Sequence, residues 1–243
     1  MKNRIATCAI LLLAAAVAAP AQVWDKKEHT KWSKNDCQRI LENSPWATKF
    51  TLTETRQEAF VADSSYGTGR ESQPRVDFTA QLRSAMPVRL AVVRQLQIES
   101  KYDKMTDEQK RNFDQRAQQY LGIEFNDRIV VQVQLSSNVQ IYQRQLITMW
   151  QGINEGAVPA NMYIITGSGQ RLPPLHFIAP THGNPVMEVV FPRRTREGDL
   201  IDGDDKEFAL EMPGIALSGD TSEPIVRFTF KPSKMKYKGE FVY

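Results

Sequence analysis

Two histidines in the C-terminal half, His176 and His182, are the side chains best suited to acid–base or metal chemistry. Imidazole changes charge near neutral pH and is the commonest metal ligand in proteins. Their spacing of six positions includes Pro180 and fits no pair of ligands on one helix. Because a metal site needs three or four converging ligands, ordinary surface or half-buried histidines are favoured. The alternative is a secreted hydrolase in which His176 or His182 acts with an acidic partner such as Asp204.

An acidic segment follows the histidines and offers a second set of metal ligands. Its carboxylates, which would suit a hard cation such as calcium, belong to Asp199, Asp202, Asp204 and Asp205. Gly203 comes too early for an EF-hand loop, and the twelfth position offers no glutamate. Asp-Gly-Asp is ordinary turn chemistry. We therefore predict a solvated turn with no metal and no cofactor, and keep a calcium-stabilised module as the alternative.

Cys37 is the one cysteine after residue 21, so no disulfide can form within the rest of the chain. It shares a helical stripe with Ile40 and Leu41, which predicts burial as a small apolar residue. Trp32 and Trp46 flank this stripe. Core packing is favoured for both tryptophans, because aromatic side chains mostly contribute buried area. Paired exposed tryptophans that bind a sugar or a peptide are the alternative.

Several helices are predicted from apolar spacing and end signals. Ser33 is a plausible N-cap for the helix that carries Cys37. Pro87 suits the first turn of the next helix. A further helix begins at Thr106, whose hydroxyl can form a capping box with Gln109, and it ends at Gly122. These last two helices make a hairpin that packs on a sheet, and helical spacing returns over 142–153.

Alternating apolar residues predict strands over 76–82 and 129–135, and a run of strands follows residue 162. The last of these is a single edge or closing strand over 237–243. The fold class is therefore α+β. A mostly antiparallel sheet or sandwich forms the C-terminal half, and the helical hairpin and further helices pack on an N-terminal sheet. The stretch 155–159 is either a subdivision of the domain or a loop within it.

Residues 1–21 have the three parts of an export signal. Lys2 and Arg4 supply a positive start, residues 10–19 are apolar, and residues 19–21 form a small-residue cleavage site. No later stretch approaches the roughly 20 apolar residues that a membrane span needs. We therefore predict a signal peptide over 1–21, no transmembrane segment after its cleavage, and a secreted or periplasmic location.

The remaining chain is predicted to hold a flexible leader over 22–31, polar apart from Trp24, and a single α+β domain over 32–243. The formal charge is +3, and loss of Lys2 and Arg4 with the signal lowers it to +1. A nucleic-acid-binding domain would keep a basic face, and no dense basic run or recognition motif is found. Nucleic acid is therefore excluded as a predicted partner.

Three short blocks resemble a family of uncharacterised bacterial secreted proteins. The first runs from Trp32-Ser33 through Cys37 and Ile40-Leu41 to Ser44-Pro45-Trp46-Ala47, and the other two are 84–89 and 191–193. The resemblance implies export and no particular activity. Together with the lack of a catalytic set in the sequence, it favours a non-enzymatic binding or structural module of the cell envelope or extracellular space, whose partner is a protein, a peptide or a glycan.

Overall fold

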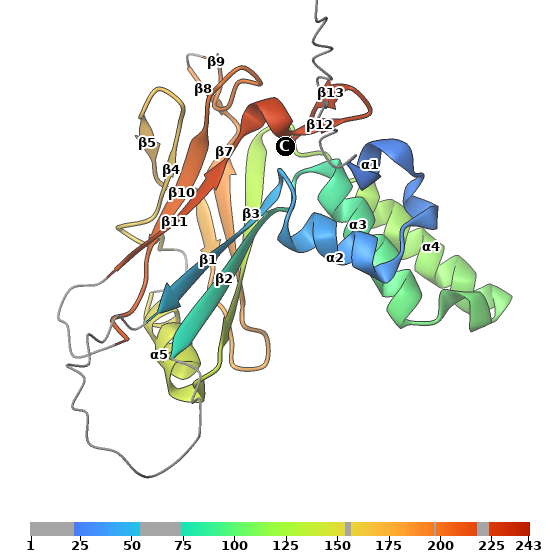
Figure 1. Cartoon of the computed structure of the whole chain (residues 1–243), viewed down its shortest axis with the longest axis horizontal. Coiled ribbons are helices and arrows are strands. Elements are labelled where there is room, and N and C mark those ends of the chain that lie inside the picture. The colour runs from blue at the N-terminus through green and yellow to red at the C-terminus, as the bar shows by residue number, and fades with distance from the viewer. Residues whose placement is uncertain (1–21, 54–73, 154–156, 197, 218–223) are drawn as a thin grey trace, which may run out of the picture.

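Two antiparallel sheets packed face to face form the core of the molecule, and several helices lie at one end of them (Figure 1). The computed structural model describes residues 22–53, 74–153, 157–196, 198–217 and 224–243. The predicted signal peptide lies outside these residues, as does most of the predicted loop over 63–74. The predicted α+β class is confirmed.

The first sheet contains strands from both halves of the chain. Its order is β1 (Ala47–Thr53), β2 (Arg75–Leu82), β3 (Arg128–Ser137), β7 (Val186–Pro192) and β6 (His176–Ile178). Alternation along β2 turns Val76, Phe78, Ala80 and Leu82 inward, and all four are fully buried. The strands predicted over 76–82 and 129–135 are therefore confirmed. Strand β3 comes before residues 155–159, and strands β6 and β7 come after them. Because β7 pairs with β3 and β6 pairs with β7, the chain on both sides of residues 155–159 contributes to this one sheet.

The second sheet is made from the C-terminal half alone. Its order is β11 (Ile225–Phe230), β10 (Phe208–Pro213), β4 (Tyr163–Ile165) and β5 (Arg171–Leu172). Phe208 and Phe230 stack within it, with ring centroids 5.0 Å apart. Phe228 meets Phe50 of β1 with a centroid distance of 6.4 Å, which joins the two sheets through one apolar layer.

The helices begin and end close to the predicted residues. They are α2 (Lys34–Glu42), α3 (Met86–Glu99), α4 (Asp107–Leu121) and α5 (Gln140–Gln151), with the short turn η2 (Tyr102–Lys104) between α3 and α4. Ser33 and Thr106 both form capping boxes, with Asp36 and Gln109. In Figure 1, α2, α3 and α4 stand together beside the sheets, whereas α5 lies below them. No helix in the described ranges combines the length and the apolar character needed to cross a bilayer.

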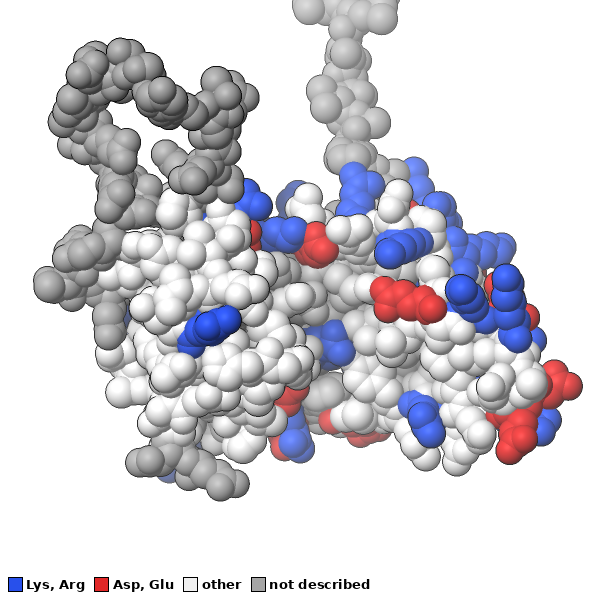
Figure 2. Space-filling model, turned by 90° about the horizontal axis from the view of Figure 1, so that it is seen from below, with Lys and Arg blue, Asp and Glu red and all other residues white. Residues whose placement is uncertain are grey.

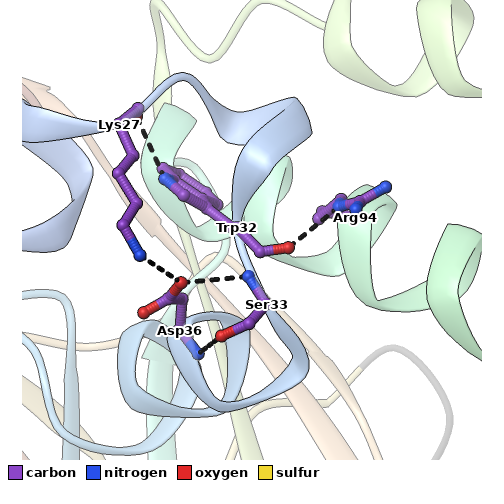
Figure 3. A network of polar contacts seen from close by, with 5 residues as sticks. All are labelled: Lys27, Trp32, Ser33, Asp36 and Arg94. Carbon is purple, nitrogen blue, oxygen red and sulfur yellow. Dashed lines mark hydrogen bonds and ion pairs between the residues drawn. The ribbon is translucent and has the colours of Figure 1, made fainter.

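Residues 22–31, predicted as a flexible leader, form the helical turns α1 (Val23–Lys26) and η1 (His29–Lys31) instead. The physical reason is Trp24, which is only 6% exposed and lies edge-on to Trp46 with a centroid distance of 5.2 Å. The segment is also tied down by polar contacts (Figure 3). Trp32 Nε1 donates to the Lys27 carbonyl at 3.1 Å, and Lys27 Nζ reaches Asp36 at 3.1 Å. These residues are therefore part of the folded domain.

The end of the chain is a hairpin, so the predicted single strand over 237–243 is wrong. After the turn η3 (Pro232–Lys234), strand β12 (Lys236–Tyr237) pairs with β13 (Glu240–Phe241). Lys238 and Gly239 between them both have positive φ, 52° and 85°. Two such residues favour a tight turn that reverses the chain. A second short hairpin, β8 (Arg194–Thr195) and β9 (Gly198–Asp199), follows β7.

Charged side chains are unevenly spread on the face seen in Figure 2. Lysine and arginine side chains gather over the helical end, where aspartate and glutamate lie among them, whereas the sandwich end is mostly uncharged. The basic residues on this face are thus mixed with acidic ones.

Cys37 is fully buried and free, as predicted, and burial raises the pKa of its thiol to about 11. A thiol with a raised pKa in the folded state stabilises the fold below its unfolded pKa, and this stability is lost as the pH rises towards the folded pKa. We expect the free energy of unfolding of the wild type to fall between about pH 9 and 11, by up to about 1.4 kcal/mol per pH unit relative to Cys37→Ala. Urea unfolding of both proteins across this range measures the difference, and parallel pH curves would contradict the prediction.

Candidate functional site

The two candidate histidines are both exposed. His176 lies on the edge strand β6 opposite Val190 of β7, and its side chain is exposed. His182 lies in the turn between β6 and β7, next to Gln143 and Arg144 of α5. Among the described residues, neither imidazole makes a hydrogen bond or an ion pair.

Asp204, the acidic partner considered for these histidines, comes after the β8–β9 hairpin that follows the other end of β7. The seven residues of β7 span roughly 20 Å. His182 precedes this strand and Asp204 follows it, whereas His176 pairs with Val190 near the end of β7. Among the described residues Asp204 makes no hydrogen bond or ion pair with either histidine, so the hydrolase hypothesis stays a prediction.

The four aspartates considered for a cation each make a local contact. Asp199 pairs with Arg194 at 2.7 Å, Asp202 accepts the Asp204 backbone N–H at 3.0 Å, and Asp205 accepts the Asp202 backbone N–H at 2.9 Å. Short-range contacts of this kind are typical of a polar turn. Within the ranges that the structure describes, no group of three or more histidine, cysteine, aspartate or glutamate side chains is placed to hold a metal ion.

A different set of residues, distant in the sequence, surrounds a cavity of about 560 Å³. It lies where the start of α3, the connection from α4 to β3, the residue after β7 and the C-terminal hairpin meet. We call it the arginine pocket, and its main residues are Ser84, Arg89, Phe125, Arg193, Phe241 and Tyr243. Its volume is in the range typical of small-ligand sites.

Arg89 is placed in the pocket by the first turns of α3 and is only 5% exposed. Its Nη1 donates to the carbonyls of Tyr120, Leu121 and Ile123 at 3.3, 2.9 and 2.8 Å. These carbonyls end α4, where the helix dipole favours a positive charge. The guanidinium carbon also lies 4.9 Å from the ring centre of Phe125, a distance at which the cation and the ring attract each other.

The remaining donors of Arg89 are not used. Its Nε is buried without a hydrogen-bond partner, and Nη2 donates to no group among the described residues. No acidic side chain of the described chain lies within ion-pair distance of it. Burial accordingly lowers the pKa of Arg89. Arg89 is thus a buried cation without an acidic partner.

Arg193 closes the pocket from the end of β7. Its Nη1 donates to the main-chain oxygen of Tyr243 at 2.7 Å and to that of Phe125 at 3.4 Å. The guanidinium lies 3.8 Å from the centre of the Tyr243 ring. These two contacts with Tyr243 hold the end of the C-terminal hairpin against the pocket.

Ser84 adds a hydroxyl that has no hydrogen-bond partner although the residue is 4% exposed. Hydrogen bonds from Arg83 N to the Val130 carbonyl and from Ala85 N to the Leu82 carbonyl hold it in the turn before α3. Buried polar groups are normally hydrogen-bonded. Ser84 and Arg89 thus both line the pocket and both carry an unused polar group, which suits a site that receives an anionic group.

Sequence reasoning missed this site, because its residues come from four distant segments with no diagnostic spacing. One signal was present: Arg89 interrupts an apolar run between Val88 and Leu90. The blocks 84–89 and 191–193, which resemble parts of a secreted family, both contribute to the pocket. The N-terminal block has a packing role, since Trp32, Cys37, Ile40 and Trp46 are all fully buried.

Comparisons of the chain with protein-family models, with curated proteins and with solved structures found no match. The resemblance to a secreted family therefore stays a prediction.

Proposed function

We propose that the chain is an exported, non-enzymatic binding module that holds an anionic group of its ligand in the arginine pocket. The observation that carries this proposal is Arg89, a buried cation with unused donors and no acidic partner. Burying an unpaired charge is costly, and the end of α4 offsets only part of that cost. A bound anion would supply the missing partner and strong, charge-assisted hydrogen bonds.

Arginine suits binding better than proton transfer. Its guanidinium stays protonated at all physiological pH values and presents donors in a fixed fork that matches a carboxylate or a phosphate. The buried guanidinium of Arg89 therefore favours holding a charged group over acid–base chemistry. The partner that follows is an envelope or extracellular protein, peptide or glycan that carries an anionic group.

Export is the second part of the proposal and rests on residues 1–21 with their positive start and apolar stretch. The mature chain is expected to begin at Gln22 and to be found in the periplasm or outside the cell. N-terminal sequencing of the chain recovered from cell fractions tests this. Recovery of the unprocessed chain with cytosolic proteins would contradict it.

Anion binding is tested by the thermal unfolding of the purified chain in sulfate, phosphate and acetate at equal ionic strength, with chloride as the reference. A ligand that binds only the folded state raises the unfolding temperature in proportion to its occupancy. We expect at least one anion to raise it in the wild type and in Arg144→Gln, a control on α5. The rise should disappear in Arg89→Gln, each protein being compared with itself in chloride. No rise in the wild type, or an equal rise in Arg89→Gln, would overturn the proposal.

A further inference from the structure

We infer that a second cavity, a basic groove beside α2, binds an acidic glycan, that is, a saccharide chain with several carboxylate or sulfate groups. We call this cavity the α2 groove. Neither Arg89 nor Arg193 lines it, so it is a separate site from the arginine pocket. The inference therefore does not rest on the anion proposed for that pocket.

The α2 groove has a volume of about 850 Å³. It is lined by residues of α2, by the turn before β1 and the first residues of that strand, and by residues at the end of β11 and in η3. A recess of about 290 Å³ adjoins it and shares Arg39, Asn43 and Ser44 with it. The groove therefore has room for a ligand larger than a single small anion.

Basic side chains outnumber acidic ones in the α2 groove, four to one. The acidic residue, Glu42, pairs with Lys49 at 2.6 Å. The other three basic residues are exposed and form no ion pair with any described residue. They are Arg39 of α2 and, at the other wall, Lys231 and Lys234. Because these three charges come from two separate segments, they favour a ligand with several negative charges.

Uncharged polar side chains also line the α2 groove. Asn35 and Asn43 supply amides, and Thr48 and Thr229 supply hydroxyls. None of these four side chains makes a hydrogen bond to another described residue. Amides and hydroxyls both donate and accept hydrogen bonds, as the hydroxyls of a sugar also do. The groove thus offers partners for sugar hydroxyls together with cations for acidic groups, which form charge-assisted hydrogen bonds.

Acidic peptides and single-stranded nucleic acids also carry repeated negative charges, but they fit these groups less well. A peptide backbone brings one N–H and one carbonyl per residue, whereas each sugar unit brings several hydroxyls. Single-stranded nucleic acids stack their bases on exposed aromatic rings. Phe230, the aromatic residue of the groove, is only 2% exposed and offers no ring face for stacking. An acidic glycan is therefore the favoured ligand.

Calorimetric titration of the whole purified chain tests this with two acidic polysaccharides and with neutral dextran. Polygalacturonate carries carboxylates and dextran sulfate carries sulfate esters, so their order shows which acidic group the groove prefers. Poly-L-glutamate and a single-stranded DNA oligonucleotide represent the other two classes. We expect at least one acidic polysaccharide to bind about 10-fold more tightly than dextran, poly-L-glutamate and the oligonucleotide. Its affinity should fall as salt is added.

A groove variant and a matched control locate the binding. The groove variant removes the three unpaired cations together: Arg39→Gln, Lys231→Gln and Lys234→Gln. The control variant removes the same charge from exposed positions of η2 and α4 outside the groove: Lys104→Gln, Arg111→Gln and Arg116→Gln. Exposed ion pairs each contribute little, so the groove variant should lose about 10-fold in affinity and the control less than about 2-fold. Circular dichroism checks that both variants are folded.

The inference is overturned if neither acidic polysaccharide binds more tightly than dextran, or if the two variants lose affinity equally. It is also overturned if poly-L-glutamate or the oligonucleotide binds through the groove cations at least as tightly as the polysaccharides. Arg89→Gln separates this site from the proposed function, because it should abolish the effect of small anions on thermal unfolding and leave polysaccharide binding unchanged. Loss of polysaccharide binding in folded Arg89→Gln would assign the ligand to the arginine pocket instead.

Discussion

Trp46→Ala is expected to lower the free energy of unfolding by about 3–5 kcal/mol, the usual cost of truncating a large buried aromatic side chain. Trp46 is fully buried in the turn just before β1 and contacts Trp24 edge to face. Its Nε1 also donates to the Val242 carbonyl at 2.6 Å. The substitution therefore removes packing against the N-terminal segment and the bond that holds the C-terminal hairpin. Urea unfolding followed by circular dichroism measures the loss.

Two further variants separate these contributions. Trp46→Phe removes the donor but keeps most of the apolar volume, so we expect a smaller loss of about 1–3 kcal/mol. Leu175→Ala changes an apolar side chain that is 63% exposed, and its effect should stay within about 0.5 kcal/mol. If Trp46→Ala and Leu175→Ala had the same unfolding midpoint, the packing role of Trp46 would be wrong.

Arg89→Ala is expected to lower the free energy of unfolding by about 3 kcal/mol, because three carbonyls at the end of α4 lose their charged donor. The loss of the contact with the Phe125 ring adds to this. The effect should be local, so amide hydrogen exchange should speed up first over the last turn of α4. Urea unfolding and hydrogen exchange of the wild type and the variant measure both parts.

Arg194→Ala is the matched comparison for stability. This arginine is also close to the pocket, but its side chain is 68% exposed and its ion pair with Asp199 is on the surface. Exposed pairs contribute about 0–1 kcal/mol. If Arg194→Ala lowered the free energy of unfolding as much as Arg89→Ala, the contacts of Arg89 with the end of α4 would not explain its effect.

Local signals in the sequence predicted the local structure well. The capping boxes at Ser33 and Thr106 formed as expected, because each involves residues only three positions apart. The alternation over 129–135 predicted β3 because it too is a pattern between residues close together in the sequence. Cys37 was correctly predicted to be buried, since its neighbours on the helical stripe are apolar.

Features that depend on distant contacts were not predicted. Residues 22–31 are mostly polar, and the order of this segment depends on one side chain, Trp24, meeting Trp46. The strand predicted over 237–243 is broken by positive φ values at Lys238 and Gly239, which alternation does not reveal. The arginine pocket needs four segments to meet, and only the three-dimensional arrangement shows that Arg89 forms no ion pair with a described acidic residue.

The bond between Trp46 and Val242 joins positions that are 196 residues apart. A growing polypeptide therefore has its first strand long before it has the acceptor that this indole requires, and such long-range closure slows folding. Until its last residues are made, the nascent chain lacks part of its core. The core around Trp46 is thus assembled from segments at opposite ends of the described ranges, so its completion depends on docking of the C-terminal hairpin.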